Sequence, residues 1–287
     1  IVKEFDAAEI SEQPFGWNLP NWLLRREMLA QMERLDTVSF RPGTGVASLF
    51  TREGEARVGL SDGGPRLRTR LVVAADGRNS AVRAAAGIGV KTMRYGQKAL
   101  AFAVTHPVPH GNVSTEIHRS GGPFTLVPLP DHEGRPSSAV VWMEDGPEAA
   151  RLADLPQAAF EAAMNERSCH IFGPLTLASR RTIWPIISQK ADRMAAERVA
   201  LVAEAAHVVP PIGAQGLNMS LGDIRVLLEL ARAAPDRLGD RDMLTRYHRR
   251  RHGEVNLRVA GIDLLDRTSM VHAQPLRDMR ALGLDML

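Results

Sequence analysis

The residues best suited to chemistry lie in one stretch, residues 198–223, where a short apolar run is followed by an acidic residue and a turn. Val199, Leu201 and Val202 predict a buried strand, and the turn after it is rich in proline and glycine. A helix is predicted to begin near Gly216, because a periodic set of apolar residues shares one of its faces: Leu217, Leu221, Ile224, Leu228 and Ala231. Since the free N–H groups and positive dipole of a helix start attract a phosphate or an electron-rich ring, this stretch predicts a cofactor site.

A second candidate site follows a strand predicted over residues 67–75, where the sequence reads DGRNSAVR. Asp76 and Gly77 form the turn, and the Asp76 carboxylate can accept hydrogen bonds from ligand hydroxyl groups. Ser80 is placed to cap the helix that follows. Arg83 is placed to pair with Asp76 or with a pyridine-nucleotide phosphate.

Other classes of catalytic site find no support. The nine histidines form no HExxH motif and no paired metal-ligand spacing, so no metal site is predicted. No Ser–His–Asp triad can be inferred, and no catalytic side chain is assigned. His207 could act as an acid or base, but we interpret it as a structural histidine that satisfies the backbone groups of its turn.

Composition indicates a soluble globular protein that can bury a substantial core, with 287 residues of which 44% are hydrophobic. No apolar run approaches the roughly 18 residues of a membrane span, and the single cysteine, Cys169, excludes a disulfide within the chain. These features predict a cytoplasmic protein. The net charge of +3 is dispersed, and nucleic-acid binding is not supported. The cluster HRRRH at residues 248–252 is interpreted as a solvated helix face, with a membrane surface or an acidic partner as the alternative.

The remaining pattern predicts two kinds of region. Residues 20–35 predict a helix with Asn21 as its N-cap. Strands over residues 37–40, 45–51 and 56–60 predict an antiparallel meander. After Gly89 come strands over residues 95–105, 113–118, 123–128 and 138–143 and an amphipathic helix over 155–166, the composition of a separate sheet with one covering helix. Pro185 is predicted to return the chain to the first region, and helices are expected over residues 240–279.

The run from Ala203 to Asp223, with its sequence AAHVVPPIGAQGLN, resembles the second flavin-binding motif of the FAD-dependent aromatic monooxygenases with the para-hydroxybenzoate hydroxylase fold. It is most similar to the ubiquinone-biosynthesis hydroxylase branch, and the DGxxSxxR spacing resembles the other cofactor motif of that family. The resemblance implies that Glu204 bonds the ribityl chain, although the family usually has Gly-Asp where this chain has Ala203-Glu204. It also implies a cofactor role for Arg25 on the first helix. The complete set of expected FAD-binding residues is Arg25, Asp76, Gly77, Glu204, Pro211, Gly213, Ala214, Gln215, Gly216, Leu217 and Asn218.

The fold that the resemblance implies is a mixed α/β (α+β) protein with an FAD-binding Rossmann-like domain and a substrate domain with a mixed β-sheet and covering helix. The first βαβ unit of the FAD-binding domain, with its GxGxxG turn, is not found, because the two weak candidates at residues 43–45 and 87–89 are not followed by a suitable helix. We expect the chain alone to retain FAD poorly. The expected domains are residues 1–88 (part of the FAD-binding domain), 89–185 (substrate domain) and 186–287 (the rest of the FAD-binding domain and C-terminal helices).

The function implied is hydroxylation of the aromatic ring of a polyprenylated ubiquinone precursor, with FAD as cofactor, NADH or NADPH as reductant and O₂ as co-substrate. A polyprenylated phenol or quinone precursor is the expected partner, with peripheral association to the inner face of the membrane or to a biosynthetic complex. Two alternatives stay open: a hydroxylase of a small soluble aromatic, and a non-catalytic flavoprotein-fold remnant. Apolar residues that either wall a substrate tunnel or form ordinary core are Phe124, Leu126, Trp142, Ile171 and Phe172.

Overall fold

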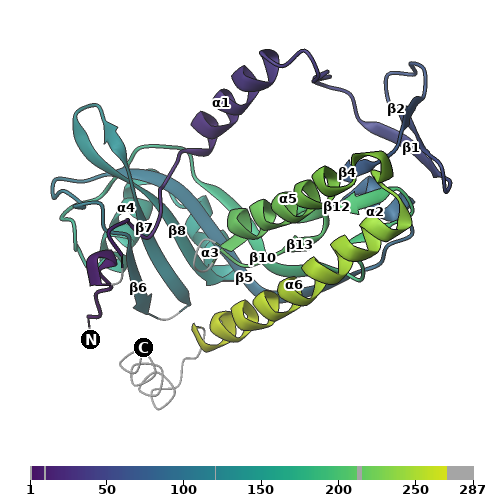
Figure 1. Ribbon diagram of the computed structural model, residues 1–287. Helices are drawn as coiled ribbons and strands as arrows, with labels where there is room; N and C mark the ends of the chain where they lie inside the picture. Colours follow the sequence, from purple (N-terminus) through teal and green to yellow (C-terminus); the bar gives the residue numbers. More distant parts are fainter. Residues whose placement is uncertain (1, 10, 120, 212–214, 270–287) are drawn as a thin grey trace. The chain divides into compact units, whose positions relative to one another are not determined.

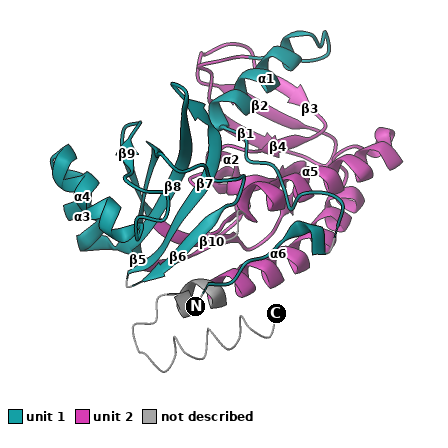
Figure 2. Ribbon diagram, turned by 90° about the vertical axis from the view of Figure 1, so that its left-hand side faces the viewer, with its two compact units in different colours: residues 1–40, 96–185, 267–287 teal, residues 41–95, 186–266 magenta. Residues whose placement is uncertain are grey.

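The computed structural model describes residues 2–9, 11–119, 121–211 and 215–269, and for residues 264–269 the helical backbone alone (Figure 1). The chain is a mixed α/β fold, as expected. It divides into two compact units (Figure 2): unit 1 contains residues 1–40, 96–185 and 267–287, and unit 2 contains residues 41–95 and 186–266. The predicted domain boundaries at residues 88 and 185 stay predictions.

Unit 2 begins with a small antiparallel sheet. Its strands are β1 (Val46–Thr51), β2 (Ala56–Leu60) and β3 (Leu67–Thr69), in the order β1-β2-β3. The predicted meander is therefore confirmed, but its first strand was placed wrongly: residues 37–40 are not a strand, and β3 takes the third place.

A second sheet of unit 2 holds the predicted buried strand. Strand β12 (Val199–Leu201) is fully buried and lies between β11 (Ala195–Ala196) and β4 (Val72–Ala74). The pairing of β12 with β4 is parallel and that with β11 is antiparallel. The single strand predicted over residues 67–75 is in fact two, β3 and β4, which belong to different sheets. The β12–β4 pair forms the floor of the apolar core of this unit.

Three helices complete unit 2: α2 (Ala81–Ala85), α5 (Gln215–Ala233) and α6 (Arg241–Ser269). Helices α5 and α6 lie side by side in both views (Figures 1 and 2), and an ion pair between Glu229 and Arg250 joins them. One long helix therefore replaces the several expected from residue 240 onward, and residues 270–279 of that prediction lie outside the described part of the chain.

Helix α5 buries a different face from the one its sequence periodicity marks. The apolar residues Leu217, Leu221, Ile224 and Leu228 are 44–58% exposed. The side chains that α5 places in the core are Met219, Val226, Leu227 and Leu230, together with the carboxylate of Asp223. The predicted apolar face exists, but within this chain it faces outward.

Unit 1 contains one antiparallel sheet built from long strands. Strand β8 (Arg135–Asp145) pairs with β5 (Val90–Thr105) on one side and with β7 (Gly122–His132) on the other, and β7 pairs with β6 (Thr115–Arg119). Short strand β9 (Thr176–Leu177) pairs with the end of β5. Strands β5 and β10 (Thr182–Ala191) each have residues in both units, and Pro185 lies within β10.

Two helices, where one was predicted, cover this sheet: α3 (Gly146–Asp154) and α4 (Gln157–Arg167). Pro156 separates them, because it cannot continue the hydrogen-bond ladder of α3 and is well placed as the N-cap of α4. Side chains of both helices join the core on one face of the sheet, where the rings of Phe102 and Phe160 meet edge to face at 5.1 Å.

Helix α1 (Asn21–Glu33) is confirmed close to its predicted bounds, but its N-cap is Pro20 rather than Asn21. None of its residues is buried. Among the described residues, no helix combines the length and apolar character needed to cross a membrane.

Candidate flavin site

The two acidic residues predicted to bind a cofactor follow adjacent parallel strands. The register pairs Leu201 of β12 with Ala74 of β4. Asp76 comes two residues after Ala74, and Glu204 comes three residues after Leu201. Because the carboxyl ends of parallel strands meet at the same edge of a sheet, both carboxylates emerge there, which is where open α/β sheets bind ligands.

Glu204 lies on a short turn, η2 (Ala203–Ala205), and remains accessible. Its side chain is 52% exposed and lies 3.5 Å from the guanidinium of Arg78, which belongs to the Asp76 turn. This pair connects the two turns across the sheet edge. In water it contributes at most about 1 kcal/mol, so it leaves the carboxylate available to a ligand.

Asp76 organises the start of helix α2. Its two carboxylate oxygens accept hydrogen bonds from Ser80 Oγ at 2.5 Å and from Val82 N at 3.1 Å. Ser80 Oγ in turn accepts from Arg83 N at 2.9 Å, so its predicted capping role is confirmed. Each carboxylate oxygen retains a second acceptor site for a ligand hydroxyl. Gly77 supports the turn with φ of +84°, a conformation that glycine adopts without strain.

Arg83 does not play the predicted role. It is buried, and its guanidinium donates to the carbonyl oxygens of Ala205 at 2.8 Å and Arg78 at 2.9 Å. It therefore pairs neither with Asp76 nor with solvent-borne phosphate. The physical reason is that a buried guanidinium is costly unless its N–H groups are hydrogen-bonded, and two backbone carbonyl oxygens lie close enough to accept from it.

Helix α5 is described from Gln215 onward, which agrees with the helix predicted to begin near Gly216. Gly216, Leu217 and Asn218 of the first turn are exposed, and nothing lies within 4 Å of the position where a Cβ on Gly216 would stand. Pro211 is exposed just before the turn, and Gly213 and Ala214 lie outside the described residues.

A buried charge network lies behind these turns. Asp223 is inaccessible and accepts from His207 Nε2 at 2.7 Å, from Arg251 Nε at 2.8 Å and from Ala203 N at 3.0 Å. Arg251 also donates to Met219 O and pairs with Glu254. His207 is buried and hydrogen-bonded, but its partner is the Asp223 carboxylate and not the backbone groups of its turn that the sequence suggested.

The sequence did not identify Asp223 as the partner of His207. The prediction that residues 248–252 form a solvated helix face was wrong for Arg251. Arg251 is fully buried, whereas Arg249 and Arg250 are exposed. The apolar periodicity of the sequence marks another face of α5, so no local signal places Asp223 on the core-facing side. A charge there demands a buried counter-charge.

Arg25 lies in α1, in unit 1, whereas the other expected cofactor residues in the described chain lie in unit 2. Its side chain is exposed. Its assignment stays a prediction.

The polar groups at this edge of unit 2 fit a flavin. Ribityl hydroxyls need acceptors, which the accessible carboxylates of Glu204 and Asp76 offer, and an electron-rich ring is favoured by a helix N-terminus with an exposed first turn, as α5 has at Gly216, Leu217 and Asn218. A metal would need a cluster of at least three His, Cys, Asp or Glu side chains, and the described residues contain none.

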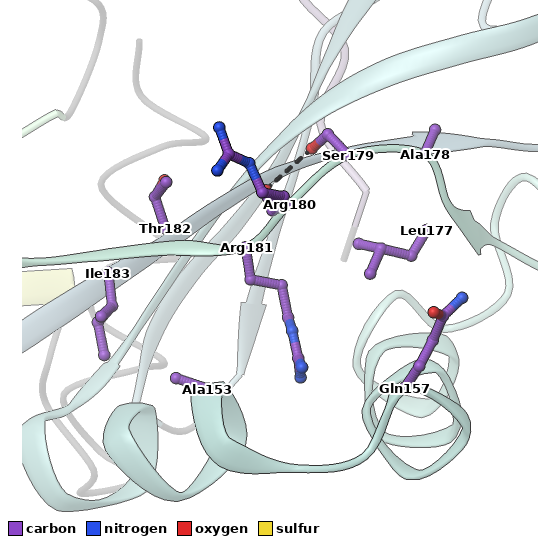
Figure 3. Close-up of a pocket in the computed structure, with 9 residues that line it drawn as sticks. All are labelled: Ala153, Gln157, Leu177, Ala178, Ser179, Arg180, Arg181, Thr182 and Ile183. Atoms are coloured by element: carbon purple, nitrogen blue, oxygen red, sulfur yellow. Dashed lines mark hydrogen bonds between the residues drawn. The ribbon is translucent and has the colours of Figure 1, made fainter.

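Two pockets are formed within single units, and neither is lined by Asp76, Gly77 or Glu204. One of about 600 Å³ lies in unit 2 beside Arg193 and His248. The other, of about 620 Å³, lies in unit 1 between the ends of α3 and α4 and residues 177–183 (Figure 3). In the close-up, the Arg181 side chain extends toward Ala153 and Arg180 points the other way. Arg181 Nη1 donates to the carbonyls of Leu152 and Leu155, so this guanidinium has a structural role.

The apolar residues considered as tunnel walls are mainly core. Phe124, Leu126, Trp142 and Phe172 are buried in the core of unit 1, and Ile171 is exposed. Phe124 and Trp142 meet edge to face at 5.5 Å. The structure thus favours the ordinary-core alternative for four of the five.

Comparison with known proteins agrees with the geometry. Residues 6–260 match the family model described as FAD binding domain. Ubiquinone hydroxylase UbiL of Rhodospirillum rubrum is 33% identical over 278 residues, covering 96% of this chain and 63% of that protein. The 3-demethoxyubiquinol 3-hydroxylase of Escherichia coli is 28% identical, covering 98% of this chain and 71% of that protein.

Solved structures show the same fold. PqsL, a probable FAD-dependent monooxygenase from Pseudomonas aeruginosa, superposes with a TM-score of 0.76 at 24% identity over 92% of this chain and 72% of that one. The p-nitrophenol 4-monooxygenase PnpA from Pseudomonas putida has a TM-score of 0.75 at 19% identity over 93% of this chain and 67% of that one.

The fold and the paired acidic turns at the sheet edge thus define a flavoprotein domain. The chain belongs to the FAD binding domain family. It spans less than two thirds of the Rhodospirillum relative.

Proposed function

We propose that this chain works in an FAD-dependent monooxygenase that hydroxylates the aromatic ring of a polyprenylated ubiquinone precursor, using NADH or NADPH and O₂. The observation that carries the flavin assignment is that Asp76 and Glu204 follow the carboxyl ends of two adjacent parallel strands, with Glu204 3.5 Å from Arg78 of the Asp76 turn. The reaction class is supported by relatives named as ubiquinone hydroxylases.

The residues of unit 2 would bind and orient the cofactor. Glu204 and Asp76 would accept from ribityl hydroxyls. The first turn of α5, at Gln215, Gly216 and Asn218, would direct its positive dipole end at the ring and stabilise negative charge there. Bound FAD supplies the oxygen chemistry, and the protein supplies position and electrostatics.

The proposed division of labour gives residues 89–185 to the substrate and residues 1–88 and 186–287 to the cofactor. The relatives named as ubiquinone hydroxylases support a lipid-like substrate for that region. Peripheral contact with a membrane or with a biosynthetic complex would supply such a substrate.

The test of the flavin assignment is Glu204→Ala in the natural protein that contains this chain. Loss of a hydrogen bond to a charged group costs about 1.5–3 kcal/mol, so the dissociation constant for FAD should rise roughly 10- to 150-fold. Flavin fluorescence titration measures it, and circular dichroism checks that the fold is kept.

The matched control is Glu197→Ala, which removes another exposed glutamate of unit 2 away from the sheet edge. It should leave the FAD affinity unchanged. Equal FAD affinity in the Glu204 variant and the unmodified protein would remove Glu204 from the site.

A further inference from the structure

The backbone of Ala203 has an unusual conformation. Its φ is +54°, in the left-handed region that residues with a Cβ rarely adopt. Alanine has no polar side chain with which to stabilise that conformation locally, as asparagine or aspartate would. Something outside the turn must therefore hold it.

Two buried side chains hold the turn from opposite ends. Asp223 Oδ2 accepts from Ala203 N at 3.0 Å, and Arg83 Nη1 donates to Ala205 O at 2.8 Å. Between these two anchored residues lies Glu204, whose side chain is the one that points out to solvent. The turn is thus fixed at both flanks of the proposed ligand-binding carboxylate.

Asp223 is itself fixed. Arg251 Nε and His207 Nε2 donate to its two oxygens, and Arg251 Nη2 donates to Met219 O on the same helix. Arg251 also packs closely on Gly222, where a Cβ would stand 3.2 Å from its guanidinium nitrogens. Since a buried carboxylate with three donors has little freedom to turn, its grip on Ala203 N is rigid.

We infer that Asp223 is a positioning residue of the flavin site: it holds Ala203 in the left-handed conformation and so presents Glu204 to the cofactor. This rests on the proposed function for the ligand, whereas the claim about the turn itself does not. Asp223 acts through the backbone and does not touch the cofactor.

The first test compares Ala203→Gly with Ala75→Gly, thermal midpoints being measured on the 287-residue chain. Ala75 is exposed and does not have a positive φ, so glycine there should lower the midpoint by increasing the freedom of the unfolded chain. At residue 203 the relief of strain should offset that cost, so the midpoint should stay or rise. An equal fall in both variants would overturn the inference. This comparison tests the conformation of Ala203, the premise of the inference, and needs no Asp223 variant to fold.

The second test is Asp223→Asn, followed by hydrogen exchange. Exchange at the amides of Ala203 and Ala206 should rise at least about tenfold more than at Leu201, whose N–H bonds to Met194 O just before strand β11 and reports unfolding of the sheet. Val226→Ala, which weakens the same helix without touching the turn, should raise the three amides alike. If exchange at all three amides also rose alike in the Asp223→Asn variant, Asp223 would stabilise the unit as a whole and would not hold this turn in particular.

The third test is rescue, read by FAD titration of the natural protein. Asp223→Asn should weaken FAD binding about tenfold or more, and Ala203→Gly in the same protein should restore most of it, because glycine adopts the required φ unaided. If Ala203→Gly changed the FAD affinity by the same factor in the Asp223→Asn variant as in the unmodified protein, the two residues would not be coupled and the inference would be overturned. Absence of FAD binding in the unmodified protein would instead refute the proposed function and leave the exchange test standing.

Discussion

At the scale of single residues, the most consequential feature is a set of charges that lie out of water. The Asp223 carboxylate and the Arg251 guanidinium are both fully buried, and they are joined at 2.8 Å. Transfer of such groups from water is costly, and the cost is met only while each has its partner. The pair is therefore sensitive to loss of one member.

We expect Arg251→Met to lower the free energy of unfolding by about 3–5 kcal/mol, because it leaves the Asp223 carboxylate buried without its counter-charge. The matched control is Arg250→Met, whose ion pair with Glu229 is about half exposed and should contribute no more than about 1 kcal/mol. Urea denaturation measures both. Equal losses would show that the buried pair has no special role.

A second residue-scale prediction concerns Glu144 in unit 1. Burial raises the pKa of this carboxyl above its ordinary value of 4.5, although the hydrogen bond from Trp142 and the charge of Arg167 oppose the rise. The folded protein then holds this proton more tightly than the unfolded chain. The stabilisation is fully present below pH 4.5 and is lost as the pH rises through the folded-state pKa.

Glu144→Gln should therefore remove a decline in stability that occurs as the pH is raised above 4.5. Glu148→Gln is the control, because the hydrogen bond from Arg151 lowers the pKa of Glu148 and its small, solvent-screened contribution has the opposite sign. The measurement is the unfolding free energy at a series of pH values. An unchanged slope in the Glu144 variant would contradict the prediction.

At the scale of elements, helix α5 has two apolar faces, one buried and one exposed. One face contributes Leu227 and Leu230 to the core, and the other presents Leu217, Leu221, Ile224 and Leu228 outward. This outward row therefore contributes little to the core of unit 2.

We predict that Leu221→Lys leaves the unfolding free energy of the 287-residue chain unchanged within about 0.5 kcal/mol, because the side chain is half exposed. Leu227→Ala, on the buried face of the same helix, should lower the free energy of unfolding by about 2–5 kcal/mol. Urea unfolding, with sedimentation to monitor self-association, measures both. A large loss in the Leu221 variant would mean that the outward face is covered in solution.

At the scale of the whole molecule, the prediction concerns whether the substrate carries a prenyl tail. A prenyl tail contributes roughly 0.8 kcal/mol per buried CH₂, so even a partly buried tail should dominate binding. We predict that the natural protein containing this chain oxidises reduced nicotinamide faster with a prenylated phenol than with its tail-less parent, coupled to ring hydroxylation.

Steady-state turnover with both compounds and mass analysis of the products is the measurement. Equal specificity constants would favour the small-aromatic alternative. Absence of turnover with either, in a protein that holds FAD, would favour the non-catalytic alternative.

The sequence by itself determined the local elements of the site. The apolar run at residues 199–202 and the periodicity after Gly216 located β12 and α5, and the DGxxSxxR spacing located the turn that Ser80 caps. These signals are short-range: strand and helix periods, capping chemistry and glycine turns act within a few residues. The mixed α/β class followed from the same signals and from the resemblance.

Only the tertiary structure decided which residues meet. Periodicity marks a face of α5 but does not say whether that face is covered, and the covered side is set by the sheet and α6 packed against it. The sequence favoured Asp76 or a phosphate as the partner of Arg83 and a solvated position for Arg251, because their actual partners, Ala205 O and Asp223, lie 122 and 28 residues away in the chain. Likewise, the turns that carry Asp76 and Glu204 come to the same edge of a sheet only through the parallel pairing of β4 with β12, because the pairing of distant strands depends on long-range packing.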